Sequence, residues 1–140
     1  MLSGSRLLSL VFFIFKSGRK MMFRFEKLDV WHRAVEFADS VYSMTRKFPN
    51  DERFGLTSQI RRAAVSVSSN IAEGSGRVSD KDFRRFIEIS YSSVMEVVSQ
   101  AQIAHRQSFL FVEDRNTLNQ QAEELSRMLS GLRNKLLSGS

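Results

Sequence analysis

Arginine and lysine side chains between positions 53 and 85 are the residues of this sequence best suited to hold a charged ligand. Seven basic residues in this segment face only three acidic ones. Guanidinium groups bind phosphate through paired hydrogen bonds, so a basic patch on a near-neutral body favours a polyanion such as RNA. A solvated helix face explains the same charges equally well. The candidate nucleic-acid-binding residues are Arg61, Arg62, Arg77, Lys81, Arg84 and Arg85.

A second group of polar residues falls on faces of two predicted helices that also carry small side chains. The group consists of Gln59, Asn70, Glu73, Ser93 and Glu96. A carboxylate beside an arginine such as Arg62 in a packed bundle specifies which helix faces pair, because leaving either charge unpaired is strongly unfavourable. We therefore expect a structural polar network here and no catalytic residue.

Enzymatic chemistry finds little support in the residue pattern. The chain has no cysteine, and we expect its two histidines, His32 and His105, on the solvated surface. No nucleophile motif occurs, and neither histidine follows a glutamate by three residues, as di-iron helical bundles require. Gly74 and Gly76 lack the lysine of a phosphate-binding loop. We expect no enzyme activity, metal, cofactor or small-molecule substrate.

Residues 1–20 form a leader that differs in character from the rest of the chain. The basic residues of this leader, all ahead of the first acid, are Arg6, Lys16, Arg19 and Lys20, and the formal net charge of the whole chain is +6. The apolar run Leu7–Phe15 is shorter than the ~20 residues of a membrane-spanning helix, and no small-residue cleavage site follows it.

We favour a translation start at Met21 or Met22, which places residues 1–20 outside the fold and makes 21–140 the folded domain. A peripheral anchor or signal, and a structural role, are the alternatives for the leader. Cysteine is absent, which fits a reducing compartment, so we expect a cytoplasmic protein without membrane attachment.

Apolar residues recur at helical spacing after the leader, and no strand pattern is evident. The predicted helices run from about 28 to 47, 51 to 74, 79 to 107, and 113 onward. Asn50 or Asp51 is the expected cap of the second helix, and Gly74 its C-terminal stop. Ser79 opens the third through a capping box. Short connections between long helices predict an all-α, antiparallel up-down four-helix bundle.

Apolar residues outside the main stripes predict self-association, because a lone bundle leaves little such surface exposed. They are Phe37, Val65, Ile89, Val98, Ile103 and Phe111. Trp31, Phe83 and Phe86 lie at helical spacing and are expected in the core rather than stacked on bases. We therefore expect a homo-oligomer.

Three segments carry a family resemblance. They are Phe25–Trp31 (FEKLDVW), Phe54–Val67 (FGLTSQIRRAAVSV) and Asn70–Gly74 (NIAEG). Their order and spacing resemble the bacterial four-helix bundle proteins encoded by intervening sequences in 23S rRNA genes, formerly called ribosomal protein S23. This family is similar to the accessory variability determinant of diversity-generating retroelements. Ser108-Phe109 replaces the Gly-Tyr turn typical of the family.

The resemblance implies a homopentameric ring of bundles with a basic surface and no enzymatic activity. It points to Arg61, Arg62, Asn70, Glu73 and Arg77 as the residues that match the family pattern. The first hypothesis is an RNA-binding ribonucleoprotein accessory. The alternative is a structural adaptor whose ring binds a protein partner such as a reverse transcriptase, with Arg61 and Arg62 at the subunit interface.

Overall fold

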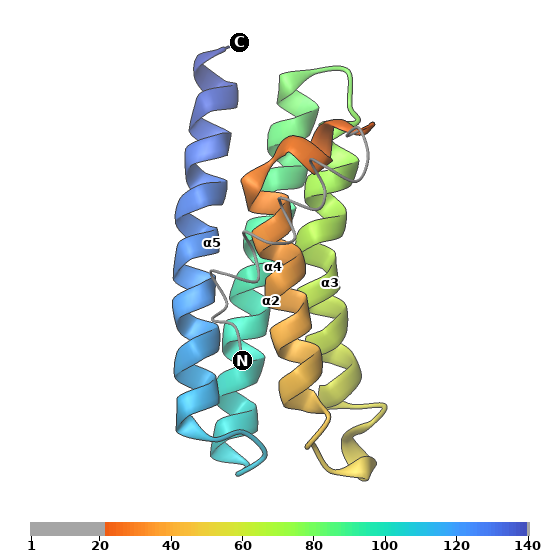
Figure 1. Cartoon of the computed structure of the whole chain (residues 1–140), viewed down its shortest axis with the longest axis vertical. Helices are drawn as coiled ribbons and strands as arrows, with labels where there is room; N and C mark the ends of the chain where they lie inside the picture. Colours follow the sequence, from red (N-terminus) through yellow and green to blue (C-terminus); the bar gives the residue numbers. More distant parts are fainter. Residues whose placement is uncertain (1–21, 140) are drawn as a thin grey trace.

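Four long helices joined by short turns form the computed structural model, which describes residues 22–139 (Figure 1). The elements in chain order are η1 (Arg24–Lys27), α2 (Asp29–Thr45), η2 (Asn50–Glu52), α3 (Leu56–Ser75), α4 (Asp80–Arg106) and α5 (Val112–Ser138). No strand occurs within this range. The prediction for the leader at residues 1–20 lies outside the described residues.

Each helix runs antiparallel to the one before it, and α5 returns to pack beside α2 (Figure 1). α3 packs on both α2 and α4, and α4 packs on α5, so the order around the bundle follows the chain. The prediction of an all-α, up-down four-helix bundle is confirmed. The longest helices, α4 and α5, have 27 residues each and are therefore about 40 Å long.

Every helix contributes a stripe of fully buried side chains to one core. The largest are Phe37, Phe83, Ile60, Ile71, Ile87, Leu118, Leu125 and Leu129. Burying each such side chain contributes roughly 1.5–3 kcal/mol, which is why the apolar spacing located the helices. Phe37 was predicted outside the stripes and is instead wholly buried, whereas Val65, Ile89, Ile103 and Phe111 are exposed.

Small residues allow α3 and α4 to pack in direct contact. The Ser90 hydroxyl donates to the carbonyl oxygen of Val67 at 2.9 Å. A Cβ on Gly74 would lie 2.7 Å from Phe86 Cβ and 2.8 Å from Phe83 Cδ1. The expected stop at Gly74 is therefore wrong, because α3 continues to Ser75 and this glycine permits helix contact.

The helix starts differ in how their free N–H groups are satisfied. The Glu52 carboxylate accepts a hydrogen bond from the N–H of Leu56 at 3.0 Å, so the predicted cap at Asn50 or Asp51 is wrong. The Ser79 hydroxyl accepts from the N–H of Asp82 at 3.1 Å, as the capping box predicts. The α3 start thus depends on a carboxylate contributed by the preceding 3-10 turn.

Ser108 turns the chain between α4 and α5. Its φ of 64° is in the left-handed region, which glycine adopts without steric penalty. The next N–H, that of Phe109, donates back to the carbonyl oxygen of Ala104 at 2.9 Å and closes the end of α4. Serine therefore adopts here the conformation that a glycine in the family's usual turn would favour.

Neither histidine is a free surface group. His32 is buried, and its Nε2 donates to the carbonyl oxygen of Glu26 at 2.7 Å, which ties η1 to α2. His105 is half-buried, and its Nδ1 donates to the carbonyl oxygen of Leu110 at 2.9 Å. The expectation of solvated histidines is wrong because both satisfy backbone carbonyls at chain turns.

Candidate nucleic-acid interface

The six predicted basic residues lie at two ends of the bundle. Arg61 and Arg62 are near the start of α3, whereas Arg77, Lys81, Arg84 and Arg85 surround the turn from α3 to α4. In Figure 1 these two regions occupy the lower and upper ends of the molecule. Most of α3, a helix of 20 residues and about 30 Å, separates them. The sequence cluster therefore forms two surfaces.

Arg61 reaches across the seam between α3 and α2. Its Nε donates to the hydroxyl of Thr45 at 2.8 Å, and its guanidinium carbon lies 4.6 Å from the centroid of the Tyr42 ring. Thr45 is buried and its hydroxyl donates to the carbonyl oxygen of Val41 at 2.7 Å. Two independent contacts on α2 thus hold the Arg61 side chain in one place.

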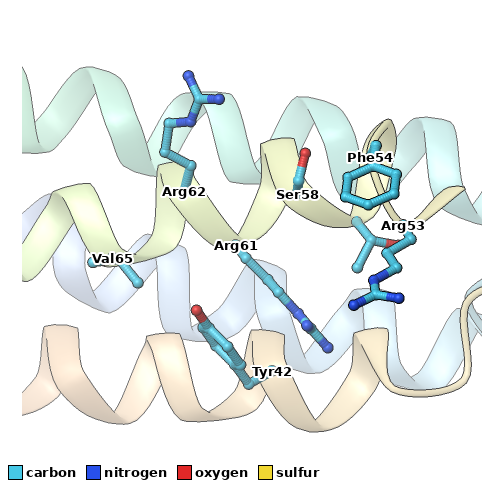
Figure 2. A pocket seen from close by; sticks show the side chains of 8 residues that line it. Tyr42, Arg53, Phe54, Ser58, Arg61, Arg62 and Val65 are labelled. Carbon is cyan, nitrogen blue, oxygen red and sulfur yellow. The ribbon is translucent and has the colours of Figure 1, made fainter.

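A groove of about 480 Å³ opens along this seam. Its lining residues are Tyr42, Arg53, Phe54, Thr57, Ser58, Arg61, Arg62 and Val65 (Figure 2). Every one of these lies in the described part of the chain, and none is acidic. We refer to this site as the α2/α3 groove. Arg53 and Arg61, together with the part of Arg62 that lines the groove, give it positive charge with no carboxylate in the lining, which is electrostatically attractive to anions.

Phe54 and Arg53 form the end of the groove nearest η2. Phe54 is 88% exposed, and the guanidinium carbon of Arg53 lies 5.4 Å from the centroid of its ring. Arg62 points away from Tyr42 and toward α4 (Figure 2). There it also lines a smaller hollow with Gln59, Glu96 and Gln100. Arg62 is therefore shared between two depressions on either side of α3.

The predicted polar network is divided between two places. Asn70 donates from Nδ2 to the Ser66 hydroxyl at 2.9 Å, and that hydroxyl shares a 2.9 Å hydrogen bond with Ser93. Gln59 and Glu96 instead line the hollow that they share with Arg62, closer to the start of α3. Glu73 is exposed. Sequence reasoning missed Ser66, although its position four residues before Asn70 on one helix face was an available signal.

At the α3–α4 turn, three arginines contact the protein itself. Arg84 donates from Nη1 to the carbonyl oxygen of Leu136 at 3.3 Å, near the end of α5. The guanidinium carbon of Arg77 lies 4.7 Å from the Phe86 ring centroid. Arg24, which sequence reasoning did not select, donates to the carbonyl oxygen of Ser75 and covers the Phe83 ring at 5.1 Å. Lys81 and Arg85 are exposed.

A third polar region lies between α2 and α5. Arg33 and Glu124 form an ion pair at 3.1 Å, and the Gln121 amide donates to Ser40 at 3.0 Å. Burial raises the pKa of Glu36, the Arg33 charge opposes this rise, and the nearby carboxylates of Glu124 and Asp39 add to it. The sequence pattern did not identify this region, because the pairing of α2 with α5 is remote along the chain.

Residues 22–139 contain neither a metal-binding cluster nor a membrane-spanning helix. No group of three or more histidine, cysteine or carboxylate side chains there is placed to hold a metal ion. None of the described helices combines the length and apolarity needed to cross a bilayer.

Comparison with known proteins identifies the family. The family described as 23S rRNA-intervening sequence protein matches residues 26–131. A solved structure of a protein of unknown function, from the S23 ribosomal protein family of Bacteroides thetaiotaomicron, shares the fold with a TM-score of 0.69. It is 22% identical, and the match covers 74% of this chain and 97% of that one. Comparison with curated proteins finds no match. Since the family match spans most of its length, this chain belongs to the 23S rRNA-intervening sequence protein family.

Proposed function

We propose that this protein is a non-enzymatic, cytoplasmic RNA-binding accessory whose α2/α3 groove contacts phosphate groups. The observation that supports this most directly is the presence of Arg53, Arg61 and Arg62 in one lining without a carboxylate among its residues. Arginine recognises phosphate through a planar fork of donors, and neutralising phosphates releases counterions from the nucleic acid.

The constraint on Arg61 strengthens the proposal. Its Nε donates to Thr45, its guanidinium group lies over the Tyr42 ring, and the side chain lines the groove. A side chain held in place before binding loses less conformational entropy when a phosphate arrives. Arg53 and Arg62 then supply further contacts on either side.

We further propose that the bundle assembles into a homo-oligomeric ring, as a pentamer. Exposed apolar side chains on α4 and at the start of α5 support self-association, because isolated bundles expose little contiguous apolar surface. They are Ile89, Met95, Ile103, Phe111 and Val112. A ring would repeat the groove around its circumference and multiply weak phosphate contacts.

RNA binding measured against ionic strength tests the main proposal. With labelled RNA and fluorescence anisotropy, the logarithm of the binding constant should fall linearly with the logarithm of salt, by roughly 0.7–0.9 for each phosphate neutralised. The double variant R61E/R62E should bind at least about tenfold more weakly and with a shallower slope. The matched control R127E/K135E changes the same number of exposed charges on α5 and should retain binding.

Affinity that stays constant between low and moderate salt, or equal losses in both double variants, would contradict the proposal.

The second candidate is a structural adaptor in which the groove holds a protein. It is supported by the exposed apolar groups of Phe54 and Val65 in the same lining. In that case R61E/R62E should lower the assembly mass in light scattering with no RNA present.

A further inference from the structure

We infer that the α2/α3 groove binds single-stranded RNA and that Phe54 is the platform on which an unpaired base stacks. This inference rests on the proposed function, in which the same groove contacts phosphate. It adds the structural class of the RNA and assigns a residue to the bases. Phosphate contacts alone hold single and double strands alike, so base contacts decide between them.

Phe54 is exposed in a way that core packing does not explain. Its side chain is 88% exposed at the groove end, although phenyl rings elsewhere in this chain, such as Phe37 and Phe83, are wholly buried. Every base has a π-face, so an exposed aromatic ring beside a basic groove is the usual platform of proteins that hold single strands. The base faces of a duplex are covered by their neighbours and are not offered to such a ring.

Arginine side chains lie in the same lining as Phe54, where they would contact the phosphates on either side of a stacked base. Arg53 lies over the Phe54 ring, with its guanidinium carbon 5.4 Å from the centroid, and Arg61 and Arg62 continue the lining. Tyr42 is the other aromatic group of the lining, and Arg61 lies over its ring at 4.6 Å. An arginine thus covers each ring, but Phe54 is 88% exposed and Tyr42 only 39%, so Phe54 is the ring more accessible to a base.

The volume and the positive charge of the α2/α3 groove favour a nucleotide as its occupant over a second copy of the chain. About 480 Å³ is within the range of pockets that enclose small organic ligands, which suits a nucleotide better than a helix. A protein occupant would have to supply several carboxylates to three arginines at once, whereas a single strand carries one phosphate for each base. Charge complementarity therefore points to the nucleic acid.

The test compares three labelled ligands of equal length: an unstructured adenine-rich RNA, an RNA hairpin closed by a non-nucleotide linker so that every base is paired, and an abasic strand. Wild-type protein should prefer the unstructured RNA to both others. F54A should weaken that binding by about 5- to 150-fold while leaving the affinity for the hairpin and the salt slope unchanged. F54L keeps an apolar side chain without a π-face and should lose nearly as much as F54A.

F23A is the matched control, because Phe23 is also exposed, at 54%, but lies just before η1, outside the groove lining and outside the apolar set assigned to self-association. It should bind the unstructured RNA as wild type does. The inference would be overturned if F54A and wild type bound the unstructured RNA equally, or if wild type preferred the hairpin. In either case R61E/R62E would still test the proposed function separately. A fall in assembly mass of F54A in light scattering would also overturn it, since Phe54 would then contact another subunit.

Absence of wild-type binding to all three ligands would overturn the proposed function and the inference together. The variants should fold, because Phe54 lies outside the core, and an unchanged thermal midpoint of F54A verifies this.

Discussion

The two basic ends of the bundle have similar residue types but use them in opposite ways. At the α3–α4 turn, Arg24 and Arg84 donate to backbone carbonyls, and Arg77 covers an aromatic ring. At the α2/α3 groove, Arg61 donates a hydrogen bond to Thr45, whereas Arg53 covers the Phe54 ring, which is itself exposed. Arginine at one end closes the fold, and at the other end it lines an open surface. Charge along the sequence does not distinguish these uses, whereas hydrogen-bond partners do.

Substitution of Gly74 should produce the largest change in stability, and the change should be confined to the end of the bundle at the α3–α4 turn. In G74A the new Cβ meets Phe86 Cβ at 2.7 Å, so the free energy of unfolding should fall by about 1–3 kcal/mol despite better helix propensity. In the control, G131A, nothing lies within 4 Å, so stability should rise by about 0.5–1 kcal/mol. Urea denaturation measures both. Equal changes in the two variants would mean that α3 and α4 are not in close contact.

Removal of the Thr45 hydroxyl should have an intermediate effect and act at the groove end. T45V keeps the side-chain shape but removes the acceptor of the Arg61 Nε–H, which should lower stability by about 1 kcal/mol. RNA affinity should fall by about threefold, because Arg61 is less well positioned.

The control T117V removes an exposed hydroxyl that donates to the Glu113 carbonyl, and its RNA affinity should equal that of wild type. If T45V bound RNA as tightly as wild type, the hydrogen bond from Arg61 to Thr45 would have no role in positioning Arg61 for RNA.

The smallest effect is expected at Glu36, between the two ends on the α2–α5 seam. Its pKa is raised in the folded protein, so the fold disfavours the charged form. This unfavourable contribution is fully present above the folded pKa and disappears below the ordinary pKa of glutamate. E36Q should therefore be more stable than wild type at neutral pH, and the gain should vanish on acidification. A pH-independent difference in thermal midpoint would contradict this account.

The fold was largely predictable because burial imposes a period on the sequence. The spacing of Ile60, Val67 and Ile71 follows directly from a helix with one face in the core. Details that depend on a partner helix were not predictable. Gly74 resembles a helix stop until Phe86 is placed opposite it, and His32 resembles a surface residue until η1 folds over it.

The candidate groove was only partly predictable, since rotation about a helix axis separates sequence neighbours. Arg61 and Arg62 are adjacent, yet one faces α2 and the other faces α4 (Figure 2). Tyr42 and Thr45 belong to another helix, and nothing local signals that they meet Arg61. In the sequence, Phe54 is distinguished only as part of the family segment, and its exposure depends on how the chain turns before α3.

The tight seam of α3 and α4 has a kinetic consequence. These helices are joined by a short turn, so bringing them together requires little loop-closure entropy, and the contacts at Gly74 and Ser90 are already near one another along the chain. We expect this hairpin to form early and α2 to dock afterwards. The α2/α3 groove would then be among the last parts to assemble, and any ligand bound in it would stabilise the folded protein against unfolding.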